Sequence, residues 1–352
     1  MNRTPGKSST AAMLALAVSI RLFWGIAADR PFVPNASWMC PLAGLIIYLP
    51  FCFAASRAER LGNDSAWGNL ANAGPKFIIH AAELIFALLL LYDCAASMRL
   101  MAYTANVLAL GEVSIILLLL PLAALLAADV LIGADAMGSS ARIWLRFMPI
   151  LFLVVFIVQA QVYNPSWLTP LFGSGAQDIL DGGLYSAGCL ALLTIPWLFS
   201  LPDRNKRPLI LYIGLSVLAA AILLAASQML TPPIIAAELS RMSRIKLVLS
   251  NGRSALSLQM LMIVLWYGAL LHLTGTEAVS AACCIKRIVP KAPQWTLALG
   301  VAVLTTIAAS SGLTSEEAGR MLYPWLFAVL GGTMITVMLS CLLKRGGKVC
   351  ES

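Results

Sequence analysis

The chain has 352 residues, of which 60% are hydrophobic and only 11% are charged. A soluble domain carries charge on about a quarter of its residues, so this composition excludes a soluble globular protein and indicates a polytopic helical membrane protein. The net charge of +8 predicts no nucleic-acid partner, because basic residues gather in the cytoplasmic loops of membrane proteins.

Apolar segments that reach or approach the length of a membrane span, about 20 residues, occur ten times along the chain. They lie at 11–28, 37–56, 77–100, 112–132, 143–161, 182–201, 208–230, 255–275, 294–311 and 322–343. The sequence therefore predicts an all-α membrane protein. Residues 1–352 are expected to form a single permease-like domain that contacts membrane lipid.

The lysines and arginines predict the orientation of these spans. If the N-terminus is cytoplasmic, sixteen of the 24 Lys and Arg residues fall in cytoplasmic segments and seven in external ones. We therefore predict that both termini are cytoplasmic. In the long external connection 231–254, Ile235, Leu239, Met242 and Leu249 share one helical face. This pattern predicts a helix that lies in the membrane interface.

Three charged residues lie inside predicted spans, where charges are costly and usually face protein or water. Arg21 lies about ten residues into the first span, or about 15 Å along a helix, and Glu83 and Asp93 lie in the third. An ion pair would offset much of the cost of burial. Local unwinding at "FWG", after Arg21, would let this side chain reach outward and favours Asp93 over Glu83. Such a pair either fixes helix packing alone or lines a cavity.

Motifs for metal binding or catalysis are missing from the sequence. His80 and Glu83 share a helix face, but no companion pair completes a metal site. The eight cysteines show no zinc-type or CxxC spacing, and G-x-S-x-G, Walker and H-E-x-x-H motifs do not occur. We therefore expect a protein that is not an enzyme and has no cofactor.

Glycine and proline interrupt the first and sixth spans. The first contains Gly25 and ends in "DRPFVP", and the sixth, "GGLYSAGCLALLTIPWLFSLP", contains Gly188 and Pro196. These spans open two halves of five, at about 11–161 and 182–343. Breaks at corresponding positions point to a transporter binding site, because they free backbone groups at mid-membrane; ordinary Gly- and Pro-containing helices are the alternative. The predicted ligand-binding residues are Phe23, Trp24, Gly25, Ile26, Ser186, Gly188 and Cys189.

Several patches, in order along nearly the whole chain, resemble the spore germination permease family, the B subunits of spore germinant receptors. This family lies within the amino acid–polyamine–organocation transporter superfamily. "RLFWGIAADRP" and "WMCPLAGLIIYLP" are similar to its first two spans, and "GADAMGSSARIWLRFMPILFL" to its entry into span 5. "YNPSWLTPLFGSG" resembles the loop before span 6. "TPPIIAAELSRMSRIKLVLSNGRSALSLQMLMIVLW" resembles the stretch leading into span 8, with Arg253 and Trp266 in the expected places.

The resemblance implies a LeuT-like fold of two inverted five-helix repeats, with broken helices 1 and 6. It also implies that an amino acid or similar small germinant binds at mid-membrane and that the signal passes to an A-type membrane subunit and a C-type lipoprotein. The expected location is the bacterial cell membrane or the spore inner membrane. Arg21 is then either the group that recognises the anion of the ligand or a counter-ion of Asp93 or Glu83. A proton-coupled amino acid transporter, with Glu83 and Asp93 carrying protons, is one alternative, and a scaffold that binds no ligand is another.

Overall fold

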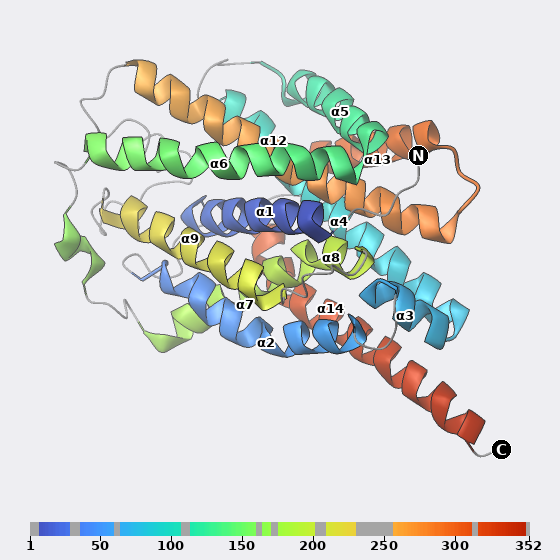
Figure 1. Ribbon diagram of the computed structural model, residues 1–352. Coiled ribbons are helices and arrows are strands. Elements are labelled where there is room, and N and C mark those ends of the chain that lie inside the picture. Colours follow the sequence, from blue (N-terminus) through green and yellow to red (C-terminus); the bar gives the residue numbers. More distant parts are fainter. Residues whose placement is uncertain are drawn as a thin grey trace.

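A computed structural model describes residues 7–28, 36–59, 64–106, 113–159, 164–169, 175–200, 209–229, 256–311 and 316–349. The long helices lie side by side in one bundle (Figure 1). In chain order the elements are α1 (Lys7–Ala28), α2 (Met39–Glu59), α3 (Ala66–Ala73), α4 (Lys76–Ala105), α5 (Ile115–Ile132), α6 (Ala134–Gln159), the 3₁₀ helix η2 (Pro165–Leu168), α7 (Ala176–Leu193), α8 (Ile195–Phe199), α9 (Leu209–Met229), α12 (Leu256–Ile288), α13 (Gln294–Ser310) and α14 (Glu316–Val349).

Each predicted apolar segment coincides with one long helix, or, for the sixth segment, with the pair α7 and α8. By length and composition, six stretches of the described residues are able to cross a membrane: Met39–Glu59, Lys76–Tyr103, Ile115–Ile132, Ala176–Phe199, Leu209–Met229 and Tyr267–Ile288. Shorter apolar helices occur at Ser9–Phe23, Gln294–Ser310 and Trp325–Leu339.

Helix α1 lies inside the bundle, where it packs against α6, α7, α9 and α12. In Figure 1 it runs between α6 and α9. Its residues from Ser9 to Leu22 are almost all buried. Many of them are Ala, Ser and Thr, small residues that let neighbouring helices approach closely. Any polar group on the buried faces of α1 therefore needs a partner from a neighbouring helix.

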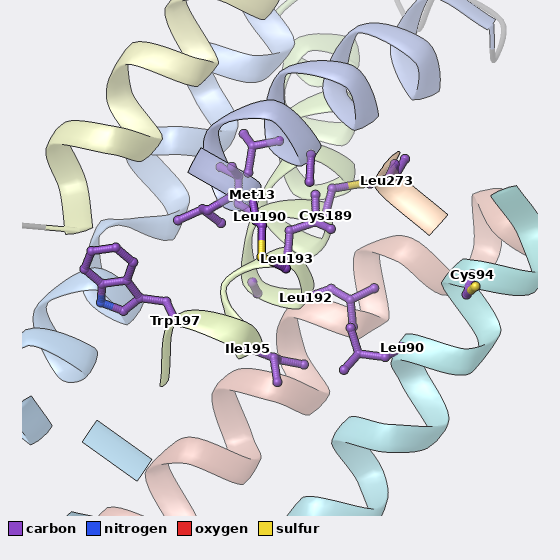
Figure 2. Close-up of a cluster of buried hydrophobic side chains, with 14 of the residues drawn as sticks. Met13, Leu90, Cys94, Cys189, Leu190, Leu192, Leu193, Ile195, Trp197 and Leu273 are labelled. Atoms are coloured by element: carbon purple, nitrogen blue, oxygen red, sulfur yellow. The ribbon is translucent and has the colours of Figure 1, made fainter. Parts of the chain in front are cut away.

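The sixth span is interrupted where α7 ends and α8 begins, at Thr194. Pro196 accounts for the interruption, because it lacks a backbone N–H and its ring clashes with the preceding turn. The Thr194 hydroxyl donates to the carbonyl of Ala191 and accepts a hydrogen bond from the Tyr48 hydroxyl of α2 at 2.8 Å. Figure 2 shows the apolar side chains around the break, with Leu193, Ile195 and Trp197 labelled. The predicted break in this span is present beside Pro196, whereas α7 continues without interruption through Gly188.

The first span differs from the prediction. Helix α1 runs without interruption from Lys7 to Ala28, so the break predicted near Gly25 is not seen. A single glycine costs a helix only about 1 kcal/mol relative to alanine, and burial of α1 inside the bundle offsets a cost of that size. The "DRPFVP" segment at 29–34 lies outside the described residues.

The eighth span is longer than predicted, since α12 continues thirteen residues beyond 275 to Ile288. Its polar residues bond within the helix: the Thr276 hydroxyl donates to the carbonyl of His272 and the Ser280 hydroxyl to that of Thr276. Residues 276–288, which lie beyond the predicted end of the span, therefore belong to the same helix. The interfacial helix predicted at 231–254 lies outside the described residues.

Candidate functional site

An ion pair joins two helices in the middle of the bundle. A terminal guanidinium nitrogen of Arg21, on α1, donates to Oδ1 of Asp93, on α4. The other terminal nitrogen donates to the Ser97 hydroxyl, one turn along α4, at 3.2 Å. Arg21 is 4% exposed and Asp93 is fully buried. The structure thus confirms Asp93 as the partner of Arg21.

Tyr323 of α14 contacts both members of this pair. Its hydroxyl donates to the same Oδ1 of Asp93, and the Arg21 guanidinium lies over its ring, 4.8 Å from the centroid. A guanidinium over an aromatic face is attracted by the ring quadrupole, most strongly where water is excluded. One side chain of α14 therefore holds both members of the ion pair.

Helix α7 covers the pair with two further side chains. The Tyr185 ring packs on that of Tyr323, with centroids 4.8 Å apart. The fully buried Cys189 lies one turn further along α7, and its thiol interacts with Arg21 and Tyr185. The ion pair is thus enclosed by helices from both halves of the chain.

A second carboxyl group reaches the cluster from α12. Glu277 is fully buried and interacts electrostatically with both Asp93 and Arg21. Among the described residues, neither oxygen of Glu277 and only one of the two oxygens of Asp93 has a hydrogen-bond donor. Two buried carboxyl groups therefore share one guanidinium. We refer to Arg21, Asp93, Ser97, Tyr323 and Glu277 as the central charge cluster.

Of the ligand-binding residues predicted on the sixth span, Cys189 alone faces this cluster. The Ser186 hydroxyl donates to the carbonyl of Gly182 at 2.8 Å, and its Cβ packs against Gly44 of α2. Gly188 lies against the backbone carbonyl of Tyr323, where a Cβ would clash. Helix packing therefore requires a small residue at Gly188.

Of the predicted ligand-binding residues on the first span, Phe23 is half-buried and packs on the hydrophobic core. Trp24, Gly25 and Ile26 continue the helix, and their side chains lie outside the described residues. Phe23 thus lies near the end of α1, whereas Cys189 faces the cluster.

Glu83 belongs to a separate polar network, ten residues or about 15 Å from Asp93 along α4. Its Oε1 accepts from the Trp67 indole of α3 at 2.9 Å and from Nε of Arg287 of α12 at 2.8 Å. Its Oε2 lies 3.0 Å from Nδ1 of His80. Glu83 is thus satisfied by neighbours at the α3 end of the bundle and is not a partner of Arg21. Within the described ranges, no three His, Cys, Asp or Glu side chains gather as they would to hold a metal ion.

Sequence reasoning missed Glu277 and Tyr323. Glu277 falls just beyond the predicted end of the eighth span, in "TGTEAVSAACC". Runs of Gly, Ala, Ser and Thr are typical of tightly packed membrane helices, so this composition was the available signal. Tyr323 stands near the start of the tenth span, where tyrosine is common at the membrane interface. Only the packing of α14 on α7 and α4 shows its role.

The bundle and its buried charges define a class: an integral membrane protein with a transporter fold. The chain is similar to an Eremococcus coleocola manganese transporter solved in complex with an aromatic bis-isothiourea substituted compound. The two are 13% identical with a TM-score of 0.52, and the match covers 95% of this chain and 78% of the transporter. At this identity the likeness concerns the fold alone, and it confirms the predicted LeuT-like class. No curated protein matches the sequence.

The family follows from the sequence itself. Residues 9–317 match the family described as "Spore germination protein", a spore permease family. This match spans most of the chain, and the chain therefore belongs to the spore germination protein family. It is a permease-like integral membrane protein of spore germination, as the resemblance of its sequence patches indicated.

Proposed function

We propose that this protein is the B-type subunit of a spore germinant receptor and senses a small nutrient, most simply an amino acid, in the spore inner membrane. The observation that carries the proposal is the central charge cluster. Charged and hydrogen-bonding groups of α1, α4, α12 and α14 converge there at full burial. Buried ionisable groups inside a membrane protein generally mark a functional site.

The break at Thr194 supports a site beside this cluster. It lies five residues beyond Cys189 in the same span, and α8, which begins there, packs against α1. An interrupted helix is a natural point for two segments of one span to move relative to each other. A ligand that displaces α7 would therefore disturb the cluster directly, and the change would pass through α14 and α4.

The role in signalling requires partners. We propose that the receptor also contains an A-type membrane subunit and a C-type lipoprotein, and that this chain performs no chemical step of its own. Signal transfer then consists of a change in helix packing that these subunits detect. Co-purification of the three chains from spore membranes tests this part of the proposal.

A proton-coupled amino acid transporter is the second candidate function. The observation that favours it is the pair of buried carboxyl groups, Asp93 and Glu277, which have oxygen atoms without a donor in the part of the chain that the structure describes. Buried carboxyls of this kind are common in proton relays of pumps and transporters. The transporter fold is compatible with either function.

One pair of measurements separates the two candidates. Spores that lack this gene, and the same spores with the gene restored, are exposed one by one to the twenty L-amino acids, and the fall in optical density is recorded. Uptake of the same radiolabelled amino acids is measured in proteoliposomes of the purified chain. A response that the gene restores, without uptake, supports sensing. Uptake driven by a proton gradient supports transport. If a correctly assembled receptor gives no response and no uptake, both candidate functions are wrong.

A further inference from the structure

The charges of the central cluster do not balance if every group is ionised. Arg21 contributes one positive charge, whereas Asp93 and Glu277 would contribute two negative charges, and all three are buried. An ionised carboxylate without a partner is strongly disfavoured in such surroundings. Among the described residues, one positive charge is therefore missing from the centre of the bundle.

The hydrogen bonds point to the place of this missing charge. Oδ1 of Asp93 accepts hydrogen bonds from Arg21 and Tyr323. Among the described residues, Oδ2 of Asp93 and both carboxyl oxygens of Glu277 have no donor. Helices α4 and α12 nevertheless meet beside these groups, where the Cys94 thiol donates to the carbonyl of Thr274, and the side chains of Asp93 and Glu277 interact there. Ionised carboxylates are acceptors only, so this interaction becomes a hydrogen bond only when a proton lies between the two groups.

We propose that Asp93 and Glu277 form a buried proton-binding pair that holds one proton, on Glu277, while the cluster is closed. The Glu277 acid O–H donates to Oδ2 of Asp93, and Asp93 stays ionised beside Arg21. This arrangement brings the cluster to zero net charge and supplies a donor to the free oxygen of Asp93. Release of the proton to water requires that the cluster open, and Glu277 is then left as a carboxylate.

The other titratable groups that the structure describes near the pair do not supply the missing charge. On α4, the Cys94 thiol donates to the carbonyl of Thr274, at 3.5 Å. On α5, Asp129 packs against Gly275, where it adds a further acidic group. His272, on α12 itself, is 4% exposed, and its Nε2 has no partner in the described part of the chain. Helix α13 carries no ionisable side chain, and Asp135 and Arg142 of α6 are exposed.

The direct test is infrared spectroscopy of the full-length protein in lipid nanodiscs, near neutral pH and without any ligand. The wild type is expected to show the carbonyl stretch of a protonated carboxylic acid, and Glu277→Gln is expected to lose it. Asp135→Asn, which changes an exposed carboxyl of α6, is the matched control and should retain the band. If Glu277→Gln loses a carboxylate band and the acid band does not change, Glu277 is ionised in the wild type and the proposal is wrong.

Stability provides a second readout. A folded state that holds a proton the unfolded state has released becomes less stable as pH rises. Glutamine resembles the protonated acid and can donate to Asp93, so Glu277→Gln should fold and should flatten this pH dependence, whereas Asp135→Asn should not. A variant that fails to fold would contradict the proposal. Stabilisation of the wild type by sodium or potassium chloride, absent in Glu277→Gln, would show a bound metal cation instead.

The proposal is independent of the proposed sensing function, because both readouts are taken without a nutrient. A protein that lacks the acid band but responds to an amino acid refutes the proton site alone. A protein that shows the band but neither responds nor transports refutes the proposed function alone.

Discussion

Arg21 is stabilised by groups from two other helices, α4 and α14, although it lies deep inside an apolar span. Asp93 supplies the counter-charge, Ser97 accepts a hydrogen bond, and Tyr323 offers its aromatic face. Removing one member of a buried ion pair is strongly destabilising, because the other charge is left without a partner. The pair is therefore expected to behave as a unit when mutated.

We expect Arg21→Ala to lower the free energy of unfolding by about 3–5 kcal/mol, the usual cost of stranding a buried charge. The double variant Arg21→Ala/Asp93→Ala should recover part of this loss, with a coupling energy of about 0.5–3 kcal/mol. Unfolding in detergent measures both quantities. Arg142→Ala, which removes an exposed arginine of α6, is the control and should change stability by about 0.5 kcal/mol or less. Strictly additive effects of the two cluster substitutions would contradict the pairing.

At the scale of the elements, close packing of α7 fixes where its polar residues point. Gly44 and Gly183 bring α2 and α7 together; a Cβ on Gly44 would lie 2.9 Å from the Gly183 carbonyl oxygen. Gly188 brings α7 against α14 at Tyr323. Small residues at such crossings are the usual means of helix association in membranes. Their positions determine that Cys189 and Tyr185 face the cluster.

Gly188→Leu is expected to destabilise the bundle by at least about 1–3 kcal/mol, because overpacking forces the backbone of α14 to move. The matched control is Gly300→Leu on α13, since nothing lies within 4 Å of a Cβ added at Gly300. Yield of folded protein and unfolding in detergent measure the difference. Equal tolerance of the two substitutions would contradict the close α7–α14 contact.

The sequence predicted the apolar helices well and the polar site less completely, for a physical reason. Apolar segments of about 20 residues are marked by composition alone, and each one coincides with described helix. Glu277 lies in a helix of small and polar residues, whose burial depends on neighbouring α4 and α1. The pairing of Arg21 was predictable because few carboxylates lay at similar depth. The roles of Tyr323 and Gly188 depend on helix crossings, which no local pattern records.

At the scale of the whole molecule, two polar networks lie at different depths of the bundle. Among the described residues, three carboxyl oxygens of the central charge cluster have no donor, whereas the Glu83 network at the α3 end satisfies both oxygens of its carboxylate. Arg287 joins α12 to α4 in that network. Because α4 and α12 carry members of both networks, a displacement at the cluster is expected to reach the α3 end.

The orientation of the whole bundle remains a prediction from its basic residues. With a cytoplasmic C-terminus, a cysteine introduced as Lys344→Cys in a Cys350→Ser background should react with a membrane-impermeant maleimide only after cells are permeabilised. The unmodified Cys350→Ser background is the control for the remaining cysteines. Labelling of Lys344→Cys on intact cells would reverse the topology and place the α3 end outside.

The site of sensing is tested most directly by the germination response of spores that carry Tyr323→Phe. This change removes only the hydroxyl that donates to Asp93, and leaves the ring over Arg21. Tyr103→Phe, at an exposed position of α4, is the matched control. With equal amounts of protein in the spore membrane, we predict that Tyr323→Phe abolishes or strongly weakens the response to the activating amino acid and that Tyr103→Phe does not. A wild-type response from Tyr323→Phe spores would contradict a role of the central charge cluster in sensing.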